Sequence, residues 1–145
     1  MIEVKRKILS NYRFIDLFAG IGGFHVALSS FGAKCVFASE LDKYAIETYV
    51  ENFNIEPAGD ITTINEQEIP QHEILCAGFP CQAFSISGKQ KGFDDIRGSL
   101  FFDIARITAF HKPKVVFLEN VKNLINHDEG RTFKVIVETL EKMDY

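Results

Sequence analysis

Three short segments of the sequence contain residue types that could bind a ligand or carry out chemistry. Residues 16–24 are rich in glycine, residues 78–85 hold Cys81 between a proline and a glutamine, and residues 119–121 begin with Glu119. Glycine lets a backbone approach a ligand closely, a cysteine thiolate is a nucleophile, and a carboxyl group can donate or accept a proton. The combination suggests a cofactor-binding turn close to a covalent catalytic centre.

The glycine-rich segment suggests a nucleoside ligand. The helix expected after it would offer unpaired N–H groups to a carboxylate or phosphate. Glu40, twenty residues after Gly20, could accept hydrogen bonds from both hydroxyls of a ribose. The spacing is Gly-x-Gly-Gly and not the Gly-x-Gly-x-x-Gly of dinucleotide binders, which disfavours an NAD-linked oxidoreductase. A structural tight turn followed by a solvated glutamate would show the same residues.

The three cysteines differ in their surroundings. They are too few and too irregularly spaced for a disulfide framework, and no Cys-x-x-Cys or His pair suggests a metal site, so we expect none. Cys35 and Cys76 lie inside apolar stretches and are predicted to be small buried side chains. Cys81 lies on a turn stiffened by Pro80, a position that by itself suits a structural or a nucleophilic thiol equally well.

Strand and helix patterns alternate along the chain. Strands are expected at 13–17, 34–39, 73–77 and 114–118, with a short stretch at 58–61. Helices are expected from residue 24 to Gly32, after an Asp42 cap, between a Ser99 cap and Pro113, and around 133–140. This order predicts an α/β fold with a doubly wound, mainly parallel sheet. Ligands of such sheets bind at the carboxyl ends of the strands, where all three segments fall.

Composition supports one globular domain over residues 1–145. The chain is 46% hydrophobic, and no apolar run approaches the ~18 residues of a membrane span. Its first residues lack the apolar stretch of a secretory signal, so a cytoplasmic protein is expected, with no membrane partner. The formal net charge of −4 is compatible with nucleic-acid binding only if basic residues gather on one part of the surface, or if the basic surface lies outside this chain.

The three segments together resemble the signature of the DNA cytosine-5 methyltransferases. The motifs are Asp-Leu-Phe-Ala-Gly-Ile-Gly-Gly-Phe from Asp16, Gly-Phe-Pro-Cys-Gln from Gly78 and Glu-Asn-Val from Glu119. Residues 76–92 closely resemble members from bacterial restriction-modification systems. The likeness runs from about Arg13 to Tyr145 and implies the Rossmann-like fold of S-adenosylmethionine-dependent methyltransferases.

The resemblance also implies that the sheet is incomplete on its C-terminal side. The family continues with an arginine-bearing element and a target-recognition domain, so residues 1–145 are expected to be the N-terminal part of the cofactor-binding and catalytic domain. We expect no activity from this chain alone. The apolar strand at 114–118 has the composition of one buried on both faces, and its expected exposure at a sheet edge predicts self-association.

The family mechanism implies a role for each catalytic residue. Cys81 would add as a thiolate to C6 of a cytosine that has been rotated out of duplex DNA, and C5 would take a methyl group from S-adenosylmethionine. Glu119 would hydrogen-bond or protonate the ring near N3 and N4, a role that a dry pocket favours.

The resemblance likewise implies the binding residues. The cofactor contacts would be Phe18, Gly20, Ile21, Gly23, Glu40, Leu41, Asp60, Ile61, Pro80 and Leu100. Glu40 would bind the ribose and Asp60 the adenine amino group, while Leu41 departs from the larger residue sometimes found in the family. DNA contacts would come from Ser85, Ser87, Lys89 and Arg97 in the loop at 78–98.

Two alternatives remain open. A tRNA cytosine-5 methyltransferase would share the nucleophile and the Glu-Asn-Val motif, although those relatives tend to carry Pro-Pro-Cys where this chain has Phe79 before Pro80. A non-catalytic subunit of a split methyltransferase would share the fold. The expected partners are duplex DNA, a second polypeptide carrying the arginine element and recognition domain, and a cognate restriction endonuclease.

Overall fold

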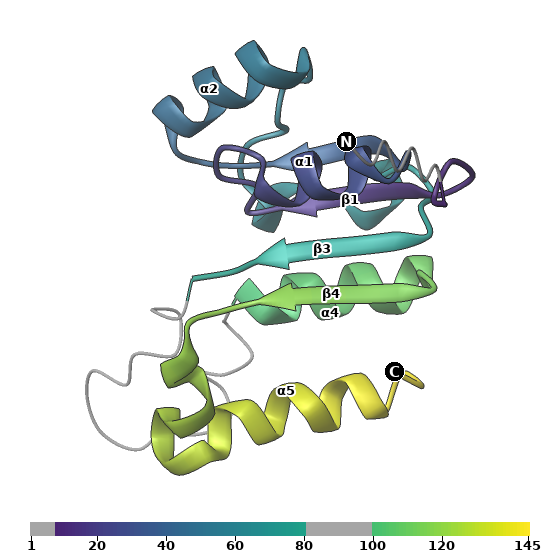
Figure 1. Ribbon diagram of the computed structural model, residues 1–145. Coiled ribbons are helices and arrows are strands. Elements are labelled where there is room, and N and C mark those ends of the chain that lie inside the picture. Colours follow the sequence, from purple (N-terminus) through teal and green to yellow (C-terminus); the bar gives the residue numbers. More distant parts are fainter. Residues whose placement is uncertain (1–7, 81–99) are drawn as a thin grey trace, which may run out of the picture.

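The computed structural model describes residues 8–80 and 100–145 and is built on one parallel sheet (Figure 1). The strand order is β2-β1-β3-β4, and every neighbouring pair is parallel. The strands are β1 Arg13–Leu17, β2 Lys34–Ser39, β3 Ile74–Gly78 and β4 Val115–Glu119. The helices are α1 Gly23–Ser30, α2 Lys43–Phe53, α4 Leu100–His111 and α5 Arg131–Glu141, with 3-10 segments η1 Ile61–Thr63, η2 Glu66–Glu68 and η4 Lys122–Gly130. The predicted α/β class with a parallel sheet is confirmed.

Helices cover both faces of the sheet because alternate strand residues point to opposite sides. On one face Phe14, Cys35 and Ile74 pack with residues of α1, including Phe24. On the other face Ile15, Leu17, Leu75 and Ala77 pack with the inner faces of α4 and α5, represented by Ile104 and Ile136. Two apolar layers therefore hold the strands, and their carboxyl ends lie along one edge.

Local signals set the helix bounds that matter for the site. The side chain of Asp42 accepts a hydrogen bond of 2.8 Å from Ala45 N and caps α2, as predicted. Asn54 ends α2 in the left-handed conformation, with φ 54°. Gly22 precedes α1 with φ 94°, a conformation that glycine adopts without strain.

The chain between α2 and β3 differs from a regular strand-helix unit. Residues 58–61 form no strand: Ala58 N donates to Ala38 O at 2.8 Å, and the chain then enters the 3-10 turn η1. The side chain of Asp60 caps that turn. Residues 58–61 are therefore attached to β2 by one backbone hydrogen bond and continue into a capped turn, without forming a strand.

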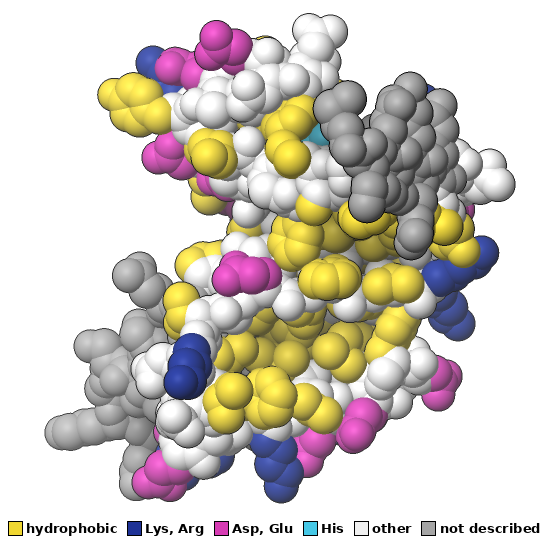
Figure 2. Space-filling model, in the orientation of Figure 1, with side chains coloured by type: hydrophobic (Ala, Val, Ile, Leu, Met, Phe, Trp, Pro, Cys, Tyr) yellow, Lys and Arg dark blue, Asp and Glu magenta, His cyan; other side chains and the backbone are white. Residues whose placement is uncertain are grey.

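Strand β4 lies at the edge of the sheet, as expected, but it is not buried on both faces. Val116 and Leu118 pack into the core, whereas Val115 and Phe117 are 42% and 55% exposed. Figure 2 shows hydrophobic side chains gathered over the middle of this face, between α1 and α5. None of the helices in the two described ranges is long and apolar enough to cross a membrane.

Candidate active site

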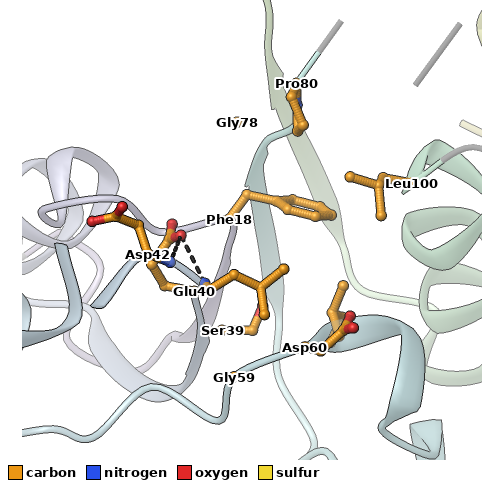
Figure 3. Close-up of a pocket in the computed structure, with 11 residues that line it drawn as sticks. Phe18, Ser39, Glu40, Asp42, Gly59, Asp60, Gly78, Pro80 and Leu100 are labelled. Carbon is orange, nitrogen blue, oxygen red and sulfur yellow. Dashed lines mark hydrogen bonds between the residues drawn. The ribbon is translucent and has the colours of Figure 1, made fainter. Parts of the chain in front are cut away.

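A pocket opens at the carboxyl ends of β1, β2 and β3 (Figure 3). Its volume is about 560 Å³, within the range of small-molecule sites. Its lining comes from the loops after three strands, from residues 59–61 at the start of η1 and from the start of α4. It consists of Phe18, Ser39, Glu40, Leu41, Asp42, Gly59, Asp60, Ile61, Gly78, Pro80 and Leu100. Seven of the ten predicted cofactor residues are therefore brought together here: Phe18, Glu40, Leu41, Asp60, Ile61, Pro80 and Leu100.

Glu40 connects the glycine-rich turn between β1 and α1 (the glycine turn) to the end of β2. One carboxylate oxygen accepts a hydrogen bond from Gly20 N at 2.7 Å. The other accepts from Leu41 N at 2.7 Å and Asp42 N at 2.9 Å. A carboxylate has about four acceptor positions, so these three bonds leave capacity for a ligand hydroxyl.

Asp60 presents a second acceptor across the pocket. Its Oδ1 receives Thr62 N at 2.9 Å and the Thr62 hydroxyl at 2.8 Å. The hydrogen bonds from Thr62 lower the pKa of Asp60. The charged carboxylate has two oxygens, so it can still accept a hydrogen bond from a ligand amino group.

The glycine turn borders the pocket without lining it along its whole length. Phe18 lies in the pocket wall and has φ 56°, a conformation rare for residues other than glycine and one that recurs at functional sites. Gly20 has φ 54° and open space where a side chain would be. Ile21 is 64% exposed, and with Gly20 and Gly23 it is absent from the lining, so these three predicted contacts lie beside the pocket.

The third predicted segment lies next to this pocket, at the end of β4. Gly78 pairs with Glu119, and a Cβ on Gly78 would lie 3.3 Å from a Glu119 carboxylate oxygen. Asn120 Nδ2 donates to Phe79 O at 2.7 Å and joins the turns after β3 and β4. Glu119 is exposed, so the dry pocket expected around it is not formed by residues 8–80 and 100–145.

The remaining predicted catalytic and DNA-contact residues lie outside the described residues. These are Cys81, Ser85, Ser87, Lys89 and Arg97. The other two cysteines behave as predicted. Cys35 and Cys76 are free and buried, and burial raises the pKa of the Cys76 thiol to about 12. A thiol in that environment is a poor nucleophile at neutral pH.

Comparison of the sequence with known protein families gives a match over nearly the whole chain. Residues 12–145 match the family of C-5 cytosine-specific DNA methylases. The chain belongs to the cytosine-5 DNA methyltransferase family.

Individual members of the family are close in sequence. The chain is 64% identical over all its 145 residues to the type II methyltransferase M.HhaI of Haemophilus parahaemolyticus, and it covers 44% of that protein. It is 59% identical over 94% of its length to the type II methyltransferase M1.ScrFI of Lactococcus lactis subsp. cremoris, covering 35% of that protein. The chain thus spans less than half the length of these relatives.

A solved structure supports the fold. The S. pombe Dnmt2 methyltransferase superposes with a TM-score of 0.68 at 23% identity, over 88% of this chain and 41% of the other. At that identity the likeness concerns the arrangement of strands and helices. It agrees with the parallel sheet and the helices on its two faces.

Some pocket residues of this methyltransferase chain were not predicted from the sequence. They are Ser39, Asp42, Gly59 and Gly78. Each is adjacent in sequence to a predicted contact or belongs to a recognised motif, so its position in the sequence could have indicated that it lines the pocket. Which neighbours line the wall depends on how the loops fold over the strand ends.

Proposed function

We propose that this chain is the N-terminal, cofactor-binding and catalytic part of an enzyme that methylates C5 of cytosine in a specific duplex DNA sequence. The observation that carries the proposal is the pocket at the strand ends, which gathers seven of the predicted cofactor residues in a member of this family. The Glu119 segment follows the adjacent strand.

The pocket suits S-adenosylmethionine. Glu40 and Asp60 supply acceptors on two sides, one for ribose hydroxyls and one for the adenine amino group, and Ile61 and Leu100 supply apolar surface for the base. The open space beside Gly20 would let the methionine end approach the backbone. The bound cofactor supplies an electrophilic methyl group on a sulfonium.

The catalytic groups proposed for the reaction are Cys81 and Glu119. The Cys81 thiolate adds to C6 of the cytosine, C5 takes the methyl group, and loss of the C5 proton with elimination of Cys81 restores the aromatic ring. Glu119 hydrogen-bonds or protonates the ring near N3 and N4 as negative charge develops there. The base must leave the stack before either atom can be reached.

The proposed partners follow from what such an enzyme must also do. The loop at 78–98, with Ser85, Ser87, Lys89 and Arg97, would contact the DNA backbone. A further segment or second polypeptide would supply the arginine element and the recognition of sequence, and a restriction endonuclease would cut unmethylated sites. Supporting this, the curated relatives named above are type II methyltransferases and are more than twice as long.

The proposal is tested by binding and transfer measurements on the same preparation. Calorimetry should show binding of S-adenosylmethionine to the chain by itself. Methyl transfer to duplex DNA should require addition of the C-terminal part of M.HhaI, and Cys81→Ser should abolish it, whereas Cys76→Ala should not. Absence of cofactor binding would refute the cofactor assignment, transfer to tRNA in place of DNA would refute the substrate, and specific transfer by the chain alone would refute its incompleteness.

A further inference from the structure

A buried polar cluster lies beneath the glycine turn, between β1, α1 and α2. Its members are Asp16 near the end of β1, His25 in the first turn of α1 and Tyr49 within α2, which are 0%, 8% and 0% exposed. The Tyr49 hydroxyl lies 2.7 Å from His25 Nδ1 and 3.5 Å from Asp16 Oδ2. None of these groups has a part in the chemistry proposed above.

Asp16 lies buried at the start of the glycine turn. Its Oδ2 accepts the Tyr49 hydroxyl at 3.5 Å, and its Oδ1 is buried with no hydrogen-bond partner among the described residues. Gly22 gives α1 no side-chain cap. Because Asp16 precedes the turn and His25 follows it, the Tyr49 hydroxyl that contacts both bridges the segment that carries Phe18 and Gly20.

Tyr49 connects a third wall of the pocket to the same cluster. Its helix, α2, begins directly after residues 40–42, which line the pocket. The Tyr49 ring also packs against the glycine turn, because a Cβ on Gly22 would lie 3.2 Å from Tyr49 Cε2. One side chain thus touches the end of β1, the turn and the start of α1.

The protonation state of Asp16 decides which hydrogen bonds the cluster can make. Tyr49 has one hydroxyl proton and three polar neighbours, His25 Nδ1 at 2.7 Å, Asp16 Oδ2 at 3.5 Å and Cys35 Sγ at 3.7 Å. With Asp16 ionised, Tyr49 can donate to Asp16 while the His25 ring donates to Tyr49. With Asp16 protonated, the direction reverses: Tyr49 can donate to His25 while the Asp16 carboxyl group donates to the Tyr49 oxygen. Burial raises the pKa of Asp16 to about 7, while the Tyr49 hydrogen bond acts in the opposite direction.

We propose that Tyr49 is a positioning residue for the cofactor pocket, whose hydroxyl holds both ends of the glycine turn so that Gly20 N–H stays directed at Glu40. The inference rests on the proposed function, because it concerns the same pocket. The titratable groups that face Asp16 are His25 from α1, Cys35 from β2, Tyr49 from α2, Cys76 from β3 and Glu40 after β2.

The first test measures the affinity for S-adenosylmethionine between pH 6 and 8.5 in the wild type, Tyr49→Phe and Tyr44→Phe. Tyr49→Phe keeps the ring packing and should raise Kd about five- to tenfold at pH 7. It should also move the midpoint of the pH profile upward, because Asp16 loses a donor that favours its charged form. Tyr44, 75% exposed on the same helix, is the matched control.

The ligand's own amino group titrates equally against all three proteins, so the difference between their profiles reports on the cluster. A purely structural role would lower the melting temperature of Tyr49→Phe without shifting the profile. Equal affinities and equal midpoints for the wild type and Tyr49→Phe would overturn the inference.

The second test needs no cofactor and separates this inference from the proposed function. Backbone amide hydrogen exchange at residues 20–25 should be at least about tenfold faster in Tyr49→Phe than in the wild type, and unchanged in Tyr44→Phe. Unchanged exchange in Tyr49→Phe would refute the positioning role. A wild type that shows this exchange pattern but binds no S-adenosylmethionine would refute the cofactor assignment and leave the positioning role of Tyr49 standing.

Discussion

At the scale of single residues, Glu40 connects two loops that the sequence separates by twenty positions. It accepts backbone N–H groups from the glycine turn and from the chain after β2. Hydrogen bonds to an ionised acceptor are stronger than neutral ones, and a carboxylate can accept from both sides at once. Glu40 would therefore shape the pocket before it binds any ligand.

Replacement of Glu40 by glutamine should weaken cofactor binding strongly. The amide can accept through one oxygen, so its NH₂ group would face a backbone N–H of either Gly20 or residues 41–42. We expect an increase of at least about tenfold in the Kd for S-adenosylmethionine, measured by calorimetry. Glu47→Gln, on the exposed side of α2, removes the same charge and should leave Kd unchanged; equal values for the two variants would contradict the assignment.

Asp16 should make the stability of the chain depend on pH. Its pKa is raised by burial from 3.8 to about 7, so the folded state holds a proton that the unfolded state has already lost. Below pH 4 this group contributes at most about 4 kcal/mol to the free energy of unfolding. That contribution decreases as pH rises and is lost by about pH 7. His72, whose pKa burial lowers to about 4, has the opposite effect between pH 4 and 6.5.

The variant Asp16→Asn removes the first of these opposing effects. Denaturant unfolding between pH 5 and 8 should then show stability that rises with pH through the His72 range, whereas the wild type varies less. Asp144→Asn, at an exposed position, controls for the loss of one charge. Parallel pH profiles for Asp16→Asn and the wild type would show that Asp16 does not hold a proton in the folded state.

At the scale of elements, the glycine turn is held by α2 as much as by the strand and helix it connects. A Cβ on Gly22 would lie 2.2 Å from Phe53 Cε2, and the Phe53 ring stacks on His25 with centroids 3.9 Å apart. The pattern of apolar residues predicted a helix at α2 but not this contact. Packing between elements distant in sequence explains why position 22 needs glycine.

Substitution of Gly22 by alanine should destabilise the fold. The residue has φ 94°, unfavourable for alanine, and the added carbon would overlap the Phe53 ring. Together these effects should lower the free energy of unfolding by about 2–5 kcal/mol. Gly23→Ala is the matched control: it adds a carbon to open space in a helix, and the change should stay within about 1 kcal/mol. Similar losses for both variants in denaturant unfolding would contradict this account.

At the scale of the whole molecule, β4 is an edge strand of the sheet formed by the described residues, and apolar side chains are exposed on one of its faces. Val115 and Phe117 are accessible there, and Phe24 packs edge-on against Phe117 with centroids 5.6 Å apart. An exposed strand edge beside an apolar surface favours association with another chain. The folded unit is therefore expected to be poorly soluble by itself.

Sedimentation at micromolar concentration should show self-association of the chain, reduced by Phe117→Lys. The charge would interrupt the apolar surface beside the open edge. Phe110→Lys, at a residue 51% exposed on α4, changes the same residue type away from the sheet edge and should leave association unaffected. A stable wild-type monomer would count against the prediction.

The sequence alone determined the order of strands and helices, the parallel sheet and the motifs that identify the family. These features depend on local spacing and residue type: apolar periodicity, the Asp42 cap, and glycine before a helix. The tertiary structure decided which strand-end residues share one pocket, that Glu40 holds the glycine turn, and that Asp16, His25 and Tyr49 meet beneath it. Such contacts depend on how loops and helices pack across the sheet, and periodicity along one segment carries no information about its distant neighbours.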